Sequence, residues 1–290
     1  MIVPQAYLGS FRLLKVVHAG QNSQLWQAYD DKRQQMAAVK AVVPRVATDT
    51  EQVGYVRQEA KVGQEVKHPR VIDIYTFNID RGTPYLGMEW FPAPNLKRRI
   101  RTRDDRAKLY PFIPTIVEQA AEGLGYLHSK SWVHRDIKPE NFLVSDTGQV
   151  KLIDFGLARR PTSWLGKVFP MKSKIQGTPS YMSPEHIRCG VMDQRADVYS
   201  FGCMLFELVA GVPPFTGSTQ EELFGKHLKA AVPSIEAADN NVTNDFANLL
   251  RRCLSKDAEG RPASAKEVLD EFKKMRMYRV FPHRSGAIAP

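Results

Sequence analysis

The sequence predicts an α+β fold in which a small β-rich lobe is followed by a larger helical lobe. Residues 11–90 contain short strand-like runs separated by polar turns, and one helical segment interrupts them. From Phe91 onward the apolar residues instead recur with helical spacing. With 290 residues, 43% of them apolar and 25% charged, the chain can bury a sizeable core in both lobes.

The first lobe is predicted to contain five strands and one helix. The strand-like runs are FRLLKVV (11–17), QLWQAYD (24–30), MAAVKAV (36–42), VIDIYTF (71–77) and TPYLGMEW (83–90). The helix is expected from about Asp49 to Val66, because Pro69 prevents its continuation. The segment FPAPN (91–95) carries two prolines and is the expected hinge between the lobes.

The second lobe is predicted to contain at least four helices. Apolar residues from Ile113 to Leu127 form one continuous stripe, which indicates a long amphipathic helix. Residues 196–211 are apolar nearly all round, so we expect a buried central helix there. Two further helices fit Asn244–Cys253 and Ala265–Lys274, the latter with Ser264 as its N-cap.

Cysteine usage and charge exclude several classes of protein. The three cysteines form neither a disulfide framework nor a zinc-binding spacing, so reduced, mostly buried thiols and a cytoplasmic location are expected. No signal peptide or 18-residue apolar run is present, so we expect no membrane span in this chain. The net charge is +10, but its basic residues are mostly dispersed. We interpret KRRIRTRDDR (97–106) as a solvated helix face and KKMRMYR (273–279) as a frayed basic terminus, and expect no nucleic-acid partner.

Polar residues are unusually dense around two short predicted strands, NFLV (141–144) and VKLI (150–153). Asp136, Lys138 and Asn141 lie just before or at the start of the first strand, and Asp154 directly follows the second. Carboxylate and amide oxygens suit Mg²⁺, and a lysine neutralises phosphate charge. The pattern therefore indicates a site for cations and a polyphosphate.

Three motifs in a fixed order then carry a resemblance. HRDIKPEN (134–141), DFG (154–156) and GTPSYMSPE (177–185) together closely resemble the eukaryotic-type (Hanks-type) serine/threonine protein kinase catalytic domain, over roughly residues 11–275. The resemblance implies a protein-kinase-like two-lobe fold within a single domain spanning 1–290. Its expected parts are an N-lobe at about 8–90, a hinge at about 89–95, a C-lobe at about 96–277 and a basic tail at 278–290.

The resemblance also implies an activity. We expect transfer of the γ-phosphoryl group of ATP, with Mg²⁺ or with Mn²⁺ in its place, to serine/threonine hydroxyls of protein substrates, including the protein itself in trans. Asp136 matches the residue that accepts or orients the substrate hydroxyl proton, and Lys138 matches the lysine that reaches the transferred phosphoryl group. Asn141 and Asp154 match the metal ligands.

Further matches define the nucleotide site. AAVK (37–40) resembles the VAIK element, so Lys40 is expected to bind the α- and β-phosphates with Glu59 as its helix partner. The adenine contacts implied by the resemblance are Leu25, Ala38, Met88 and Leu143, with the backbone of Glu89, Trp90 and Phe91. The resemblance also implies structural roles for three residues: Glu185 is expected to pair with Arg261, and Asp197 is expected to hold the catalytic loop.

Two departures from the family pattern stand out. In VHAGQNSQLW (17–26), the three glycine positions fall at His18, Gly20 and Ser23, with Ala19 between the first two. With one glycine left, we expect this turn to cover ATP but to bind it more loosely. Gly63 replaces a large apolar residue, which predicts a gap between Phe155 and Ile74 and a helix that a partner or a phosphate must settle.

The resemblance also carries expectations about control and substrate. Arg135 precedes Asp136, as in members that are regulated by phosphorylation of the activation segment. The candidate acceptors are Thr162, Ser163 and Ser173, surrounded by the cations Arg159, Arg160, Lys167, Lys172 and Lys174. Asn95 and the basic residues after it predict no strong preference for arginine-rich substrates. Residues 215–228 and 253–268 resemble bacterial members of the family, many of which continue into a membrane segment. This chain is therefore also compatible with being the cytoplasmic domain of a longer membrane-anchored protein.

Three alternatives remain open at this point. The first is a pseudokinase or nucleotide-binding scaffold with weak or no catalysis, suggested by His18, Ser23 and Gly63. The second is a small-molecule phosphotransferase such as an aminoglycoside kinase, and the third is a nucleic-acid-binding module, which only the net charge favours.

Overall fold

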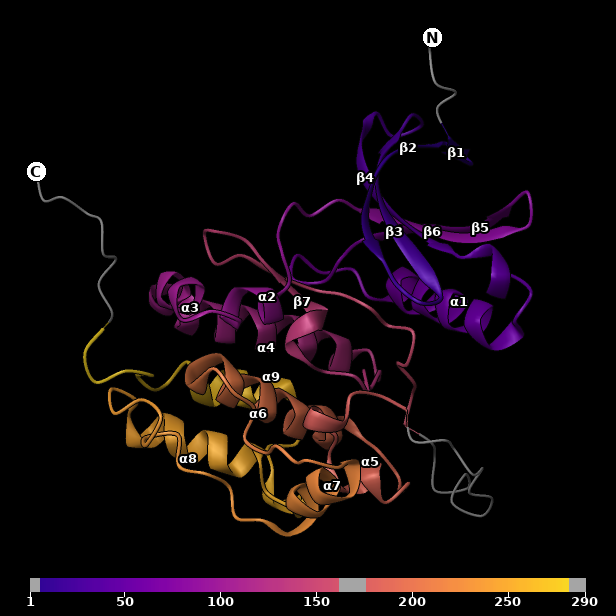
Figure 1. The fold of residues 1–290 in the computed structure, drawn as a ribbon. Coiled ribbons are helices and arrows are strands. Elements are labelled where there is room, and N and C mark those ends of the chain that lie inside the picture. Colours follow the sequence, from indigo (N-terminus) through magenta and orange to yellow (C-terminus); the bar gives the residue numbers. More distant parts are fainter. Residues whose placement is uncertain (1–5, 162–175, 282–290) are drawn as a thin grey trace, which may run out of the picture. The chain divides into compact units, whose positions relative to one another are not determined.

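A computed structural model describes residues 6–161 and 176–281 of the chain. These residues fall into two compact units. Unit 1 comprises the described residues up to Pro92 together with Ile153–Ala158, and unit 2 comprises Ala93–Leu152 and the described residues from Arg159 onward. Unit 1 holds a curled antiparallel sheet and unit 2 is helical, as Figure 1 shows, so the predicted α+β fold of a protein kinase is confirmed.

Unit 1 is built on a six-stranded antiparallel sheet with the strand order β1-β2-β3-β4-β6-β5. Its strands are β1 (Tyr7–Leu8), β2 (Phe11–Ala19), β3 (Ser23–Asp30), β4 (Gln35–Val42), β5 (Ile74–Asp80) and β6 (Thr83–Glu89). All five predicted strands are present, although β5 begins three residues later than the sequence pattern indicates.

The two faces of this sheet have different roles. On one face, Phe11, Ala28, Val39 and Tyr85 belong to a compact apolar core. Because paired residues of neighbouring strands point to the same side and successive residues alternate, the other face carries Lys40 of β4 with the residues paired to it. The residues on that face are Leu25, Ala38, Lys40, Leu86 and Met88. The strand register therefore brings the predicted adenine contacts and the predicted phosphate lysine of unit 1 together.

One helix, α1 (Thr50–Glu65), packs against β5 and β6 (Figure 1). It begins where the sequence predicts, because the Asp49 side chain accepts hydrogen bonds from the backbone N–H groups of Glu51 and Gln52. Its inward face buries Glu59 as well as the apolar residues Val56 and Val62.

The expected gap at Gly63 is not present, so that prediction was wrong. The side chain of Ile74 lies directly against the glycine, and a Cβ built on Gly63 would stand 2.6 Å from Ile74 Cβ and 2.7 Å from its Cγ1. Ile74 is 2% exposed, and Phe155 is fully buried. Residue 63 must therefore be glycine to admit Ile74, which fills the space that we expected to be empty.

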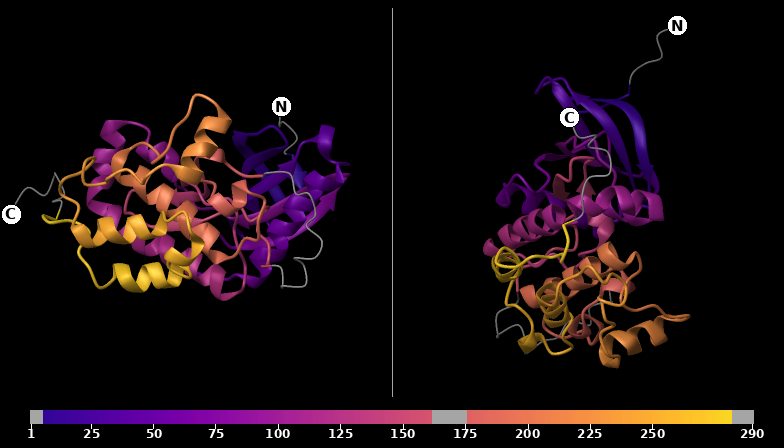
Figure 2. Two further views of the ribbon diagram at one scale, coloured as in Figure 1. Left: turned by 90° about the horizontal axis from the view of Figure 1, so that it is seen from below. Right: turned by 90° about the vertical axis from the view of Figure 1, so that its left-hand side faces the viewer.

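Unit 2 consists mainly of helices, which Figure 2 shows in two further views, and its helix α6 contacts α4, α8 and α9. The helices are α2 (Leu96–Ile100), α3 (Arg103–Leu109), α4 (Ile113–Ser129), α5 (Pro184–Ile187), α6 (Gln194–Ala210), α7 (Gln220–Lys229), α8 (Asn244–Cys253) and α9 (Ala265–Phe272). Every residue of α6 from Ala196 to Val209 is buried, as the sequence predicts for a central helix. A two-stranded sheet pairs β7 (Phe142–Val144) with β8 (Val150–Leu152).

The segment interpreted as a frayed basic terminus is instead packed onto unit 2. Met277 and Tyr278 are both 4% exposed, and the Tyr278 ring lies 4.9 Å from that of Tyr110. The Arg279 guanidinium donates to the backbone carbonyl of Val242, and Asn241 makes hydrogen bonds with the backbone of Val280. Alternating basic and apolar residues concealed this docking, because Met277 and Tyr278 find their partners far away in the sequence.

The three cysteines are free thiols, with Cys203 and Cys253 buried and Cys189 exposed. No helix within residues 6–161 and 176–281 has the length and apolarity needed to cross a lipid bilayer.

Two glycines of α1 give a matched stability test. Gly54 is exposed and an added Cβ meets no atom within 4 Å, whereas at Gly63 it would collide with Ile74. We expect Gly54→Ala to raise the free energy of unfolding by about 0.5–1 kcal/mol, since alanine favours a helix over glycine. Gly63→Ala should lower it by about 1–3 kcal/mol through overpacking. Denaturant unfolding measures both, and equal stabilisation by the two variants would contradict the packing of Ile74 on Gly63.

Candidate active site

In unit 1, three charged residues from distant parts of the sequence meet at the sheet face that carries Lys40. The Lys40 Nζ atom lies 2.8 Å from Glu59 Oε2 and 3.5 Å from Asp154 Oδ1. Strand β4 supplies Lys40, helix α1 supplies Glu59, and Asp154 follows β8 in the chain. The pairing of Lys40 with Glu59, predicted from their spacing to neighbouring motifs, is thus present in the structure.

The three charges set one another's protonation. Burial alone would lower the pKa of Lys40, but the negative charges of Asp154 and Glu59 raise it above the ordinary value of a lysine. Burial raises the pKa of Glu59, which is 2% exposed, and the positive charge of Lys40 opposes that rise. Lys40 is therefore held firmly as an ammonium ion beside two carboxyl groups.

Asp154 stands in an unusual backbone conformation. Its φ angle is 65°, in the left-handed region that side chains other than glycine rarely occupy. Such strain persists only where surrounding structure fixes it, and here the adjacent Phe155 is fully buried. The Asp154 side chain remains 44% exposed, so its carboxylate is available to a ligand.

The turn between β2 and β3 is closed by a hydrogen bond from the Gly20 N–H to the Ser23 carbonyl at 2.9 Å. His18 and Ser23 are strand residues, paired with Leu25 and Val42 respectively. Gly20 is not among the described glycines that have a positive φ angle, so the turn itself does not demand a glycine-only conformation there. Space does matter, because a Cβ on Gly20 would stand 3.2 Å from the Ser23 carbonyl oxygen.

In unit 2, the residues of the predicted catalytic loop converge on the carboxylate of Asp136. Lys138 Nζ lies 2.6 Å from Asp136 Oδ2 and 2.8 Å from Thr178 Oγ1. The Thr178 hydroxyl donates to Asp136 Oδ1 at 3.2 Å. The Asn141 side-chain amide donates to the backbone carbonyl of Asp136 at 2.7 Å. The geometry fixes the Asp136 carboxylate between a cation and a hydroxyl.

The loop that carries Asp136 is anchored from below by a buried carboxylate on α6. Asp197 is 1% exposed and accepts hydrogen bonds from the backbone N–H groups of His134 at 2.6 Å and Arg135 at 2.8 Å. Burial alone would raise the pKa of Asp197, but hydrogen bonding to His128 and to the backbone holds it below its ordinary value. The structural role predicted for Asp197 is present.

A third partner of Asp197, His128, was not predicted from the sequence. His128 Nε2 lies 3.0 Å from Asp197 Oδ2, and His128 Nδ1 accepts from the Ala265 N–H. Those partners imply that Nε2 carries the proton. A histidine in the last turn of the apolar stripe of α4 was the available signal, since a buried imidazole there requires polar partners.

The predicted pair of Glu185 and Arg261 is also present. Both nitrogen ends of the Arg261 guanidinium bind the Glu185 carboxylate, at 2.7 and 3.0 Å. Arg261 also donates to backbone carbonyls of Ser255 and Arg195, and the residue is 5% exposed. This fork-like geometry fixes the position of α5, which begins within the last residues of the GTPSYMSPE segment.

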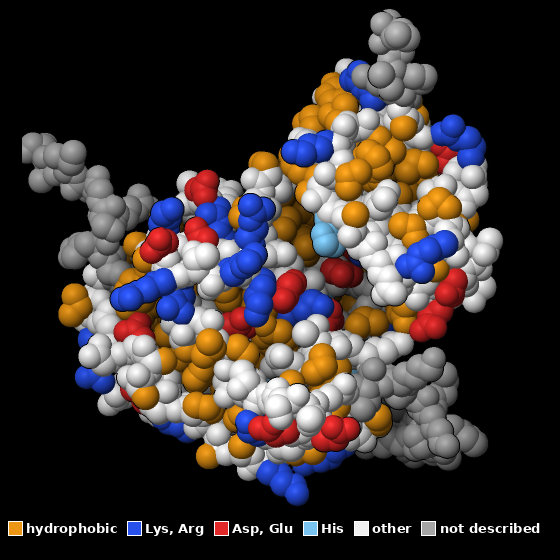
Figure 3. Space-filling model, in the orientation of Figure 1, with side chains coloured by type: hydrophobic (Ala, Val, Ile, Leu, Met, Phe, Trp, Pro, Cys, Tyr) orange, Lys and Arg blue, Asp and Glu red, His pale blue; other side chains and the backbone are white. Residues whose placement is uncertain are grey.

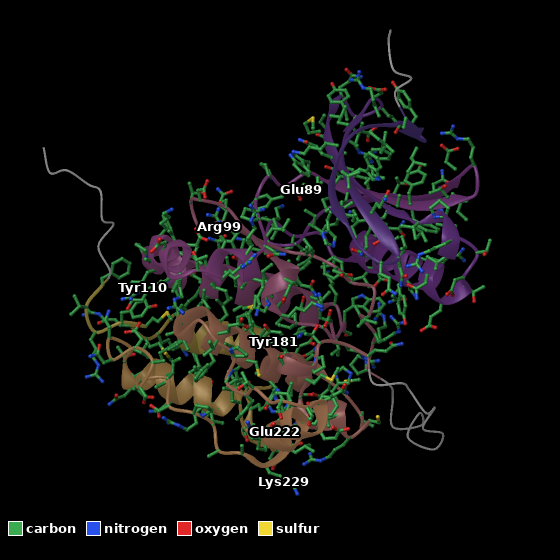
Figure 4. All side chains as sticks on the ribbon, in the orientation of Figure 1. Glu89, Arg99, Tyr110, Tyr181, Glu222 and Lys229 are labelled. Atoms are coloured by element: carbon green, nitrogen blue, oxygen red, sulfur yellow. The ribbon has the colours of Figure 1, made fainter. Side chains whose placement is uncertain are left out.

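The predicted site residues divide between the two units. Unit 1 contains His18, Ala19, Gly20, Ser23, Leu25, Ala38, Lys40, Glu59, Met88, Glu89, Trp90, Phe91 and Asp154, and unit 2 contains Asp136, Lys138, Asn141 and Leu143. Glu89, labelled in Figure 4, gives its backbone N–H to the Asp73 carbonyl at 2.8 Å, and its side chain accepts from the Asp73 N–H. The strand end at Glu89 is therefore fixed, and Leu143 is fixed by a β-bridge to Asn95.

The chain matches the family model of the protein kinase domain over residues 11–272. It belongs to the protein kinase family. Similar curated proteins include the serine/threonine-protein kinase PrkC of Bacillus subtilis, 28% identical over 274 residues that make up 94% of this chain and 41% of the relative. The serine/threonine-protein kinase PknB of Mycobacterium tuberculosis is 28% identical over 280 residues, covering 92% of this chain and 43% of the relative. The kinase domain thus spans about two fifths of the length of these relatives.

The residues of this kinase domain fit a divalent metal ion by their chemistry. The Asn141 Nδ2 group is engaged by the Asp136 backbone, so its Oδ1 oxygen is the atom left for a cation. Asp154 offers a partly exposed carboxylate. These are hard oxygen donors of the kind that Mg²⁺ and Mn²⁺ take.

The candidate activation-segment acceptors Thr162, Ser163 and Ser173 and the cations Lys167, Lys172 and Lys174 lie outside the described residues. Arg135, which sequence reasoning linked to them, is described. Its backbone has a φ angle of 69°, and its buried Nε atom has no hydrogen-bond partner within the described part of the chain. Burial lowers the pKa of Arg135, and the nearby positive charge of Arg159 lowers it further.

The buried Asp197 predicts a specific pH dependence of stability. Its folded-state pKa lies below the ordinary value of 3.8, so its contribution is fully present above that value and is lost as the pH falls through the folded-state pKa. Asp197→Asn should lower the free energy of unfolding by about 1–3 kcal/mol at neutral pH. The difference between wild type and variant should shrink only in acid, as measured by denaturant unfolding from about pH 7 to about pH 2.5. A constant difference across that range would contradict the assignment.

Proposed function

We propose that this domain transfers the γ-phosphoryl group of ATP to serine and threonine hydroxyls of protein substrates. The observation that carries the proposal is the arrangement at Asp136, whose carboxylate is held by Lys138 and Thr178 on a loop anchored by Asp197. Asp136 can orient and accept the proton of an incoming hydroxyl, and Lys138 can compensate negative charge that develops on the transferred group. The names of the relatives support the choice of serine and threonine.

The nucleotide roles follow from the residues of unit 1. Lys40, held as an ammonium ion by Glu59, would bind the α- and β-phosphates, and Leu25, Ala38 and Met88 would contact adenine from the same sheet face. Asp154 and Asn141 would hold the metal ion, for which we propose Mg²⁺ rather than Mn²⁺. The bound ion neutralises phosphate charge and orients the triphosphate.

Two alternatives are weaker. The relatives PrkC and PknB are named as kinases and so give no support for a pseudokinase. The residues whose loss is typical of pseudokinases are retained here as Lys40, Asp136 and Asp154, and Asn141 is retained as well. A small-molecule phosphotransferase is disfavoured because Thr178 and the segment after it, which are unnecessary for a small acceptor, are tied to Asp136 and anchored by Arg261. The cytoplasmic location and the absence of a nucleic-acid partner stay predictions.

We further propose control by phosphorylation of the segment that contains Thr162, Ser163 and Ser173. Arg135 has a buried guanidinium Nε without a partner in the described residues, and Arg159 lies close enough to affect its pKa. Two neighbouring guanidinium groups repel each other, and a phosphate of charge about −2 would relieve that repulsion and accept a hydrogen bond from the Arg135 Nε atom. The protein itself, acting in trans, is the proposed source of this phosphate.

Asp136→Asn tests the activity. Because asparagine cannot accept the hydroxyl proton, we expect the rate of phosphate transfer from radiolabelled ATP to a generic protein substrate to fall by about 10²–10⁴-fold. Thermal unfolding should show that the variant stays folded. Asp104→Asn, on the exposed surface of α3, is the matched control and should keep full activity. Equal labelling by wild type and Asp136→Asn would refute the proposed role.

Intact-mass spectrometry tests the proposed regulation by phosphorylation. After incubation with ATP, wild type should gain at least one phosphate within residues 162–175, whereas Asp136→Asn should gain none. Arg135→Ala should still accept phosphate from active wild-type protein, but its activity should no longer rise on phosphorylation. Unmodified wild type, or an equal rise in Arg135→Ala, would contradict phosphate binding by Arg135.

A further inference from the structure

An internal ion pair lies beside the catalytic loop of unit 2 and has no part in the roles assigned above. The Lys97 ammonium group on α2 contacts Glu207 Oε1 on α6 and donates to the Tyr181 hydroxyl at 3.3 Å. Tyr181, labelled in Figure 4, donates in turn to Glu207 Oε2 at 2.5 Å. We call Lys97, Tyr181, Glu207 and the nearby Glu140 the Glu207 cluster.

The Glu207 cluster contains more negative than positive charge. Glu207 is 2% exposed and Tyr181 is 4% exposed, so both are removed from water. Glu140 also acts electrostatically on Tyr181, and its buried Oε2 atom has no hydrogen-bond partner within the described part of the chain. Burial and the charge of Glu207 raise the pKa of Tyr181, which stays neutral. The Lys97 ammonium group contacts the carboxylate of Glu207, and no described residue donates a hydrogen bond to the buried Oε2 atom of Glu140, although buried polar atoms are normally paired.

The cluster is directly connected to the acceptor side of the proposed active site. The Tyr181 N–H donates to the Thr178 carbonyl, and the Thr178 hydroxyl donates to Asp136. Glu140 belongs to the same loop as Asp136, four residues further on. A protein substrate that presents its hydroxyl to Asp136 therefore carries neighbouring side chains past this cluster.

Unlike Tyr181 and Glu207, Lys97 can be reached from solvent. Its side chain is 43% exposed, whereas that of Glu207 is 2% exposed. Lys and Arg side chains gather over α2 and α3 in Figure 3, in keeping with the basic sequence of these helices. Among them, Lys97 is the one that reaches Glu207, and Arg98 next to it is exposed and has no side-chain partner within the described residues.

We propose that Lys97 is a specificity-determining residue: its ammonium group occupies a position suited to a basic side chain of the substrate, and so excludes substrates with Arg or Lys there. This inference rests on the proposed function. A substrate guanidinium would have to displace Lys97 or approach its charge closely, and like charges in a partly desolvated site repel strongly. Without Lys97, the carboxylates of Glu207 and Glu140 would attract that guanidinium instead.

The experiment uses peptides with one serine in a neutral background and a single Arg or Ala at each of four positions on either side. The measured quantity is the ratio of kcat/KM for the Arg peptide to that for the Ala peptide. Wild type should give ratios of one or less. Lys97→Gln, which keeps a hydrogen-bond donor for Glu207, should raise the ratio at least tenfold at one or two neighbouring positions, equivalent to about 1.4 kcal/mol.

Matched controls separate this effect from bulk charge. Arg98→Gln removes the same charge one residue along α2 and should leave every ratio unchanged. Adding Glu140→Gln to Lys97→Gln should reduce the gain, because one of the two attracting charges is lost. An equal gain in Arg98→Gln, a gain at every position, or no gain in folded Lys97→Gln would overturn the inference.

The wild-type measurements are also decisive alone. A tenfold preference of wild type for Arg over Ala at any position would overturn the proposal, whatever the stability of the variants. If wild type phosphorylates none of the peptides and no generic protein, the proposed function itself fails, and the inference with it. Transfer to peptides with equal ratios in all variants instead refutes the role of Lys97 and leaves the proposed function intact.

Discussion

The carboxylate of Asp197 is almost fully buried, and two consecutive backbone N–H groups, those of His134 and Arg135, point at it. Removing a carboxylate from water is costly unless several donors satisfy it, and His128 supplies a further one. The same contacts hold Arg135 at a positive φ angle, which a free chain would avoid. The next residue is Asp136, so the direction of the proposed catalytic carboxylate depends on a charge buried in the core of α6. This gives a physical reason for a buried acid near the start of a helix whose other buried residues are mostly apolar.

A comparable logic applies to Lys40 in unit 1. Its sheet face is shared with apolar residues, and an ammonium group on such a face is stable only beside negative charge. Glu59 and Asp154 supply that charge, and both come from segments outside the sheet. The position of α1 relative to β4 is therefore coupled to the charge state of Lys40. Gly63 also helps to fix the position of α1 against the sheet, because Ile74 of β5 can contact α1 closely only where no Cβ intervenes.

Features of the fold that depend on neighbouring residues could be predicted from the sequence, whereas contacts between separate elements could not. Strand alternation, the stripe of α4, the start of α1 near Asp49 and the cap at Ser264 depend on neighbouring residues, and all were predicted correctly. Motif order was equally informative, since it paired Lys40 with Glu59. In contrast, Tyr278 on Tyr110 and Lys97 on Glu207 are contacts between residues far apart in sequence, and Ile74 on Gly63 is a contact between a strand and a helix. No periodicity encodes them, because each depends on which side chain happens to fill the space beside its partner.

The single glycine of the β2–β3 turn can be understood in the same terms. His18 and Ser23 are paired strand residues without a positive φ angle, so the backbone tolerates side chains there even though the β2–β3 register is irregular between Val16 and His18. The turn between them is closed by the hydrogen bond of Gly20 to Ser23, and crowding near the Ser23 carbonyl favours the smallest residue at position 20. Glycines at 18 and 23 are thus unnecessary for folding the turn. What their absence changes is how closely the backbone N–H groups can approach a phosphate, which bears on the affinity for nucleotide and not on the placement of Lys40 or Asp154.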